Sequence, residues 1–142
     1  MPGVYEKLGV HFLYPENWTL DEEEGLHGSV TVTLYSPKGA FWSIAVHPKG
    51  VDPRTLATAA LKTLQAEYPD SEAEPVTEQI GGRDIGGYDF NFFYLDFTST
   101  ALIRGFRTAS ASCLVLCQAE DREYVELAPV FRAITTSLLA ER

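Results

Sequence analysis

Cysteine, basic side chains and long apolar runs are all scarce in this sequence, and each scarcity excludes a class of protein. The 142 residues include 2 cysteines, and 11 lysines and arginines against 20 aspartates and glutamates, which gives a formal net charge of -9. Nucleic-acid binding relies on clustered lysine and arginine, so this charge argues against nucleic acid and against an anionic membrane surface. No apolar run approaches the roughly 20 residues that span a bilayer. The negative charge suits a soluble protein. It also suits docking to a partner protein that has a basic face.

The first 18 residues lack the basic start and the uninterrupted apolar core of a secretion signal, so we expect a cytoplasmic protein. Cys113 and Cys117 lie four residues apart in one expected strand. Their α-carbons would then be about 13 Å apart, whereas a disulfide allows less than about 7 Å. We expect two free thiols packed in the core, which agrees with a reducing compartment.

The chain fits one domain, because no repeat, low-complexity tract or linker divides residues 1–142. Alternating or continuous apolar patterns bounded by turn residues predict strands. The expected strands are Val10–Tyr14, Ser29–Tyr35, Ala40–His47, Pro75–Ile80, Tyr88–Phe97, Ala101–Thr108 and Ser112–Ala119. Gly81–Gly82 and Thr98–Thr100 are expected to be tight turns.

Two helices are expected. Asp52 and Pro53 suit the cap and the first position of a helix that ends near Tyr68. Its apolar stripe is predicted to be Leu56, Ala59, Ala60, Thr63 and Leu64. A second helix is expected over residues 121–139, with a kink or a restart at Pro129, which cannot donate a hydrogen bond to the preceding turn. Its inner face is predicted to be Tyr124, Leu127, Ala128, Phe131, Ile134 and Leu138.

The order of elements is then β-β-β-α-β-β-β-β-α. Tyr88–Phe97 is apolar on both faces, which is typical of a strand in a sheet that is covered on both sides. We therefore predict an α+β fold with a single antiparallel sheet flanked by helices.

Three groups of residues resemble the PsbP-like superfamily. They are Phe12–Trp18, the hairpin Val32–Pro37 with Trp42–Val46, and the ending Phe131–Ile134 with Ser137–Leu139. The superfamily is named for an extrinsic subunit of photosystem II, and its fold is shared with a fungal nuclear import factor that binds the GTPase Ran. The resemblance implies an antiparallel sheet between helices, and a role in binding or assembly without a shared catalytic centre. It transfers no metal-holding or partner-contacting residue.

No pattern commits the chain to a chemistry. The glycine-rich stretch Gly81–Gly87 precedes a strand, so a hairpin turn with a bulge is favoured over a phosphate loop. A zinc site from His27 with Glu22–Glu24 is conceivable, but loop acids beside a loop histidine are usually only solvated. No serine lies in a nucleophile elbow, and the two cysteines lie among apolar residues. We expect no enzyme, no metal and no cofactor.

Four polar residues interrupt the apolar strands, namely Asp89, Asn91, Arg104 and Arg107. Buried charges must be paired, so one interpretation is an ion pair in which Asp89 or Asp96 meets Arg104 or Arg107. The other interpretation is the polar floor of a ligand pocket.

The acidic run Asp21, Glu22, Glu23 and Glu24 is expected in a solvated loop, where it would either serve solubility or steer a basic partner. Trp18 and Trp42 flank the first hairpin. Both are expected in the core by default, and an exposed one would be an anchor for a partner. The leading functional hypothesis is thus a non-catalytic module that binds another protein. The alternative is a binder of a small apolar ligand between sheet and helix.

Overall fold

The computed structural model describes residues 1–140, and this part of the chain holds nine strands and two α-helices. Seven strands form one antiparallel sheet in the order β3-β4-β5-β9-β8-β7-β6. Their bounds are Thr19–Glu24 (β3), Val30–Tyr35 (β4), Phe41–Pro48 (β5), Ser71–Ile80 (β6), Arg83–Tyr94 (β7), Phe97–Arg107 (β8) and Ala111–Glu120 (β9). The remaining strands, Gly3–Lys7 (β1) and Val10–Tyr14 (β2), pair with each other in a separate hairpin.

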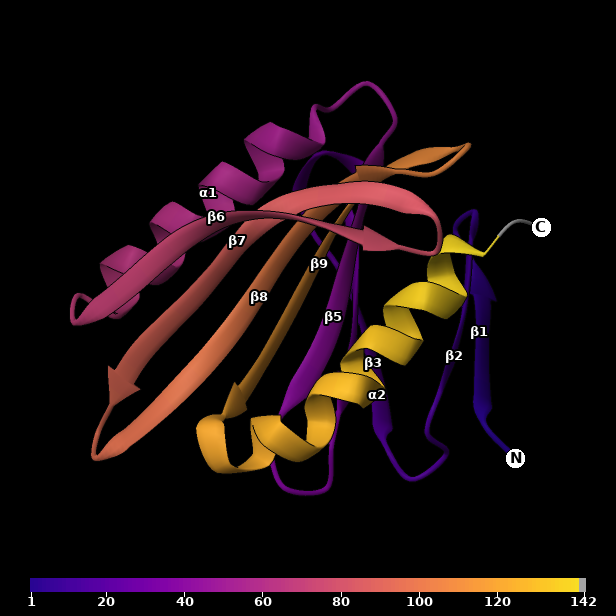
Figure 1. Ribbon diagram of the computed structural model, residues 1–142. Helices are drawn as coiled ribbons and strands as arrows, with labels where there is room; N and C mark the ends of the chain where they lie inside the picture. Colours follow the sequence, from indigo (N-terminus) through magenta and orange to yellow (C-terminus); the bar gives the residue numbers. More distant parts are fainter. Residues whose placement is uncertain (141–142) are drawn as a thin grey trace.

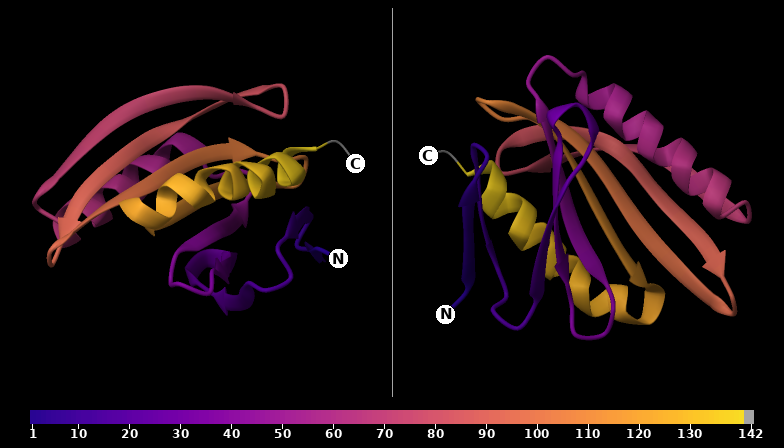
Figure 2. Two further views of the ribbon diagram at one scale, coloured as in Figure 1. Left: turned by 60° about the horizontal axis from the view of Figure 1, so that its bottom comes forward. Right: turned by 180° about the vertical axis from the view of Figure 1, so that it is seen from behind.

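The two helices lie on opposite faces of the large sheet (Figures 1 and 2). Helix α1 (Pro53–Glu67) packs on β7, β8 and β9, and helix α2 (Asp121–Leu139) lies on the other face beside the β1–β2 hairpin. The predicted α+β class with an antiparallel sheet between helices is confirmed. All seven expected strands exist. Val10–Tyr14 has the expected bounds and the other six have shifted ends, but β1 and β3 were missed.

Each face of the sheet has its own apolar core. Under α1 lie Ala57, Leu64, Phe90, Phe92, Ala101 and Ile103. The larger core, under α2 and the β1–β2 hairpin, includes Phe12, Trp42, Ile44, Ile85, Val115, Phe131 and Ile134. On β7 the two faces differ: Phe90 and Phe92 are buried under α1, whereas on the other face Ile85 is buried and Phe93 is exposed.

The predicted stripe of α1 is partly wrong. Asp52 Oδ1 accepts a hydrogen bond from the Arg54 N–H at 2.9 Å, as expected of a cap. However, the buried residues are Pro53, Ala57 and Leu64, whereas Ala59 and Thr63 are exposed. The helix is thus rotated about its axis relative to the prediction, because Ala57 and Leu64 pack on the aromatic residues of β7. The spacing of apolar residues alone did not distinguish this face from its neighbour.

Helix α2 does not restart at Pro129, because one helical segment spans Asp121–Leu139. That part of the expectation is wrong, and the kink stays a prediction. The proline frees the carbonyl of Val125, which lies at an exposed position where water can hydrate it. The helix is held on the sheet by Phe131, Ile134 and Leu138, as its apolar spacing predicted.

Two of the expected turns have different outcomes. Gly81 and Gly82 have φ of 59° and 81° and reverse the chain between β6 and β7, which confirms that turn. No bulge follows it, since β7 keeps a continuous register with both neighbouring strands. The turn expected at Thr98–Thr100 is wrong, because those residues lie in β8 and the reversal occurs at Leu95–Asp96.

Candidate functional site

The acidic run does not lie in a loop. Asp21–Glu24 lies in β3, the edge strand of the large sheet, paired with β4. Glu22 accepts a hydrogen bond from the Tyr5 hydroxyl at 2.9 Å and lies 3.6 Å from Lys7. Burial, and then this contact with Glu22, raises the pKa of Tyr5. Charged side chains on an edge strand hinder its pairing with another chain, which gives the acids a role within the fold.

Both tryptophans are buried in the core, which was the default expectation, and neither is an exposed anchor. Trp42 Nε1 donates a hydrogen bond to Thr135 Oγ1 at 3.0 Å, and Trp18 meets Phe131 edge to face with ring centroids 6.0 Å apart. The β3 acids and the tryptophans therefore do not form one surface.

Arg104, whose side chain is buried, is the centre of a polar cluster under α2. Its guanidinium donates to Glu78 at 2.9 Å and to Asp89 at 2.8 Å, which confirms the expected pairing of Asp89 with an arginine. It also donates to the carbonyls of Tyr88 and Ile103, and Arg132 lies 3.3 Å from Glu78. A cavity of about 210 Å³ lies over this cluster. The two arginines of the cluster pair with its two acids, which suits a structural role.

The other two candidates for a polar pocket lie elsewhere. Arg107 lies three residues after Arg104 in β8, so its side chain points to the opposite face of the sheet. There it donates to the carbonyls of Lys49 and Val51 at 3.2 and 3.3 Å. Asn91 is exposed and lies toward the β7–β8 turn, where it is paired with Thr100. The predicted set of four is thus one ion pair, Asp89 with Arg104, and two residues, Asn91 and Arg107, that lie apart from it and from each other.

The cysteines are free and buried. Burial raises the pKa of the Cys113 thiol to about 12 and also raises the pKa of the Cys117 thiol. Neither thiol is poised as a nucleophile. Within residues 1–140 no group of three or more histidine, cysteine, aspartate or glutamate side chains could hold a metal ion.

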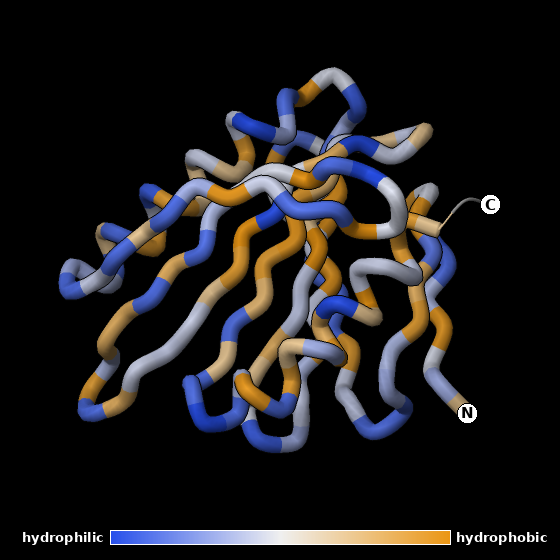
Figure 3. The backbone as a smooth tube through the Cα atoms, viewed as in Figure 1, coloured by the Kyte–Doolittle hydropathy of each residue, from blue (hydrophilic) through white to orange (hydrophobic). Residues whose placement is uncertain are grey.

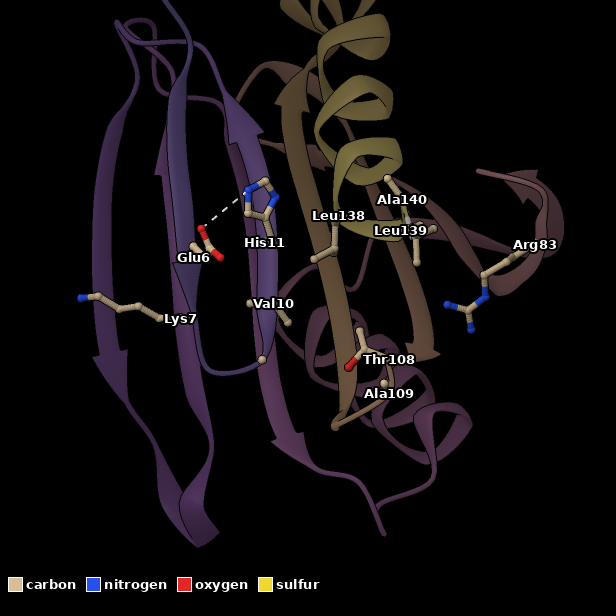
Figure 4. Close-up of a pocket in the computed structure, with 11 residues that line it drawn as sticks. Glu6, Lys7, Val10, His11, Arg83, Thr108, Ala109, Leu138, Leu139 and Ala140 are labelled. Atoms are coloured by element: carbon tan, nitrogen blue, oxygen red, sulfur yellow. Dashed lines mark ion pairs between the residues drawn. The ribbon is translucent and has the colours of Figure 1, made fainter. Parts of the chain in front are cut away.

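A cleft of about 730 Å³ lies between the β1–β2 hairpin, the β8–β9 turn and the end of α2 (Figure 4). Val10, Leu138 and Leu139 contribute its apolar lining. The charged ends of Lys7 and Arg83 lie on opposite sides of it. A binding pocket for a polar ligand needs polar groups that converge, and these do not.

A different feature stands out at the free end of the β7–β8 hairpin. Four large apolar side chains are exposed there: Phe93 by 55%, Tyr94 by 56%, Leu95 by 78% and Phe97 by 43%. We call these four residues the apolar tip. It projects beyond the start of α2, and its orange segments in Figure 3 mark apolar residues at the edge of the molecule.

Aromatic and cation–π contacts pack against the base of the apolar tip. Tyr68 stacks on Phe92 with ring centroids 4.2 Å apart and meets Tyr94 edge to face at 5.6 Å. Arg122 lies over the ring of Phe97 at 5.7 Å. These contacts hold the base of the hairpin while the outer surfaces of its side chains stay in water.

Leu95 has a φ of 57°, in the left-handed region that glycine and asparagine prefer. A leucine there costs about 1–2 kcal/mol, and its exposed side chain recovers little of that by packing. An exposed and strained apolar residue is a candidate for a function other than folding.

Beside the apolar tip, on the α2 side of the sheet, lies a groove of about 230 Å³. Its walls include Phe93 and Thr98 and the acids Asp70, Glu72 and Asp121. Asp121 Oδ1 accepts a hydrogen bond from Thr100 Oγ1 at 2.7 Å, which fixes one wall. We call this the tip groove.

Sequence reasoning missed the apolar tip as a site. It assigned Tyr88–Phe97 to one strand, so Phe93, Leu95 and Phe97 were expected on a covered face. The usable signal was weak: Asp96 favours a turn, but Asp89 and Asn91 in the same run do so as well.

No protein-family model matches the chain, and no curated protein matches it in sequence. Solved structures do match its fold. Cyanobacterial PsbP from Synechocystis superposes with a TM-score of 0.63 at 13% identity, over 96% of this chain and 90% of that one. The fold is therefore PsbP-like.

Two further structures agree. A Bacteroides thetaiotaomicron protein matches with a TM-score of 0.65 at 14% identity, over 98% of this chain and 48% of that one, so this chain spans about half of its length. A Pseudomonas aeruginosa protein of unknown function matches with a TM-score of 0.54 at 13% identity, over 99% and 98% of the two chains. At these identities the likeness concerns the fold alone.

Proposed function

We propose that this PsbP-like chain is a non-catalytic module that binds another protein, and that the apolar tip is its docking surface. The observation that carries the proposal is the exposure of four large apolar side chains at one projecting end of the sheet. Apolar and aromatic residues that gather on a surface mark sites of association, and aromatic anchors dominate the binding energy of interfaces.

The magnitude is sufficient for a specific contact. Fully burying a large apolar side chain contributes about 1.5–3 kcal/mol, so covering the exposed half of four of them contributes roughly 3–6 kcal/mol. Micromolar affinity corresponds to about 8 kcal/mol, and the tip would supply a large part of it before the cost of association.

The proposal that the chain is non-catalytic is supported by the interactions of its buried arginine and its two thiols. Arg104 is bonded to Glu78 and Asp89, and the two thiols are buried. A general base or a nucleophile must reach a substrate, and these groups face each other or the core.

We also propose a cytoplasmic location. Cys113 and Cys117 are unpaired, and free cysteines are usual where thiols are kept reduced. No helix within residues 1–140 is long and apolar enough to cross a membrane.

A small apolar ligand is the second candidate. The aromatic faces of β7 do not leave room for it, since Phe90 and Phe92 are buried against α1. The cleft of Figure 4 is the better place, because its volume of about 730 Å³ falls within the roughly 300–1,000 Å³ of ligand pockets. Saturable binding of a fluorescent fatty-acid analogue that Ala109→Trp abolishes would favour this candidate. Non-saturable binding, or no effect of the substitution, would remove it.

The experiment for the leading proposal is site-specific photo-cross-linking in cells of the source organism. A benzophenone amino acid replaces Tyr94 in the apolar tip. The matched control replaces Tyr35, which is 44% exposed on β4. We expect a protein that cross-links from residue 94 and not from residue 35, and that binds the purified chain in vitro. Identical products from both positions, or none from residue 94, would refute the proposal.

A further inference from the structure

The apolar tip lies in an acidic surround. Five carboxylates lie near it, and we call them the tip acids. Asp70, Glu72 and Asp121 line the tip groove, Asp96 lies in the turn, and Glu67 lies near the side chain of Tyr68, which contacts Tyr94. None of the five forms an ion pair with another residue of the described part of the chain. A cation beside the tip, Arg122, is 3.0 Å from Glu120, so that carboxylate offsets its charge. This end of the molecule therefore carries five carboxylates that have no ion-pair partner within residues 1–140, in a chain whose net charge is -9.

Backbone geometry places these acids next to the tip. The Phe93 N–H donates to the Asp70 carbonyl at 3.2 Å, and Glu72 is paired with Asn91 across the β6–β7 ladder. Asp96 is in the turn itself. A partner that covers Phe93 and Leu95 must bring its own surface against these carboxylates.

The tip groove has the size of a site for one side chain. Its volume of about 230 Å³ lies below the roughly 300–1,000 Å³ of small-molecule pockets. Phe93 forms one wall, on which the aliphatic stem of a lysine or arginine can lie. Asp70, Glu72 and Asp121 then face its cationic head.

We propose that the partner is a protein with an apolar pocket for the tip and, at the rim of that pocket, a lysine or arginine that enters the tip groove. This inference rests on the proposed function, and it adds the chemistry of the partner. The same carboxylates repel the anionic surface of a lipid membrane, so an aromatic tip that inserts into lipid is disfavoured.

The test compares two double variants that change the net charge equally. Asp70→Asn with Glu72→Gln removes two tip acids. Glu23→Gln with Glu24→Gln removes two exposed acids from β3, at the opposite edge of the seven-stranded sheet. The edges of such a sheet are about 29 Å apart, beyond the screening length of about 8–10 Å in salt near 0.1 M. Affinity for the protein cross-linked from residue 94 is measured by calorimetry at about 0.05 and 0.3 M salt, across which the screening length falls more than twofold.

We expect the tip-acid variant to bind at least about tenfold more weakly at low salt, with a smaller salt dependence, while the β3 variant binds like the wild type. Equal affinities for the tip-acid variant and the wild type would overturn the inference and leave the proposed function intact. A loss caused by the β3 variant instead would move the charged contact to β3. Failure of the cross-linking itself would refute both.

Lipid is tested separately. The probes are vesicles of phosphatidylcholine alone and with phosphatidylserine. We expect no sedimentation of the chain with either. Sedimentation that Leu95→Asn abolishes would overturn the inference in favour of membrane insertion.

Discussion

Replacing Arg104 with methionine is expected to destabilise the fold by about 3 kcal/mol, because it removes a buried cation and leaves its two acidic partners in place. The Arg104 side chain is 6% exposed and is bonded to Glu78, Asp89 and two backbone carbonyls. Methionine keeps much of the aliphatic volume, so little of the effect should come from a cavity.

The magnitude follows from what happens to the acids. Removing one partner of a buried ion pair costs about 3–5 kcal/mol when the remaining charge stays buried. The side chains of Glu78 and Asp89 are 34% and 38% exposed, so water can hydrate them, and the lower end of that range applies. For a chain of this size the change corresponds to roughly 6–12 °C in the melting temperature.

Urea unfolding followed by circular dichroism measures the effect, with Arg107→Met as the control. Arg107 is exposed and donates to two carbonyls at 3.2 and 3.3 Å, so its loss should cost no more than about 1 kcal/mol. Equal stability of Arg104→Met and the wild type would refute the structural role of the cluster. The cavity over it would then become a candidate ligand site.

Further predictions concern the core. Gly87→Ala should cost more than about 2 kcal/mol in urea unfolding, because its Cβ would collide with the Ile103 carbonyl, whereas Gly86→Ala, with its nearest atom 3.9 Å away, should be tolerated. Similar stabilities for the two would contradict the β7–β8 register. Cys113 and Cys117 should react with a thiol reagent at pH 8 only after unfolding, since they are buried and burial raises both pKa values. Fast reaction of the native protein, or no thiols after unfolding without reductant, would refute this.

Much of the fold could be predicted from local patterns. The cap at Asp52, the turn at Gly81–Gly82 and the inner face of α2 each follow from a single strong signal. Asp21–Glu24 was expected in a loop because acids disfavour strands. Pairing with β4 overrode that preference, as tertiary context often does.

The candidate site could not be predicted in the same way. The reversal at Leu95–Asp96 contains no glycine or asparagine, so the run from Tyr88 to Phe97 had the pattern of one strand. Leucine disfavours the left-handed backbone conformation that the turn requires at Leu95. Such conflicts between local preference and fold are expected at functional sites. Arg104 with Asp89 was foreseeable from the need to pair buried charges, but the strand register decided which arginine met the acid.

The most direct test of the docking surface uses the two leucines that occupy left-handed turn positions. Leu95 in the apolar tip and Leu8 in the β1–β2 turn have φ of 57° and 60°. Glycine relieves the strain at either position, so both Leu→Gly variants should stay within about 1 kcal/mol of wild-type stability. Calorimetric titration with the protein cross-linked from residue 94 is predicted to show at least a tenfold weaker affinity for Leu95→Gly and an unchanged affinity for Leu8→Gly. A Leu95→Gly variant that is folded and binds like the wild type would contradict the account.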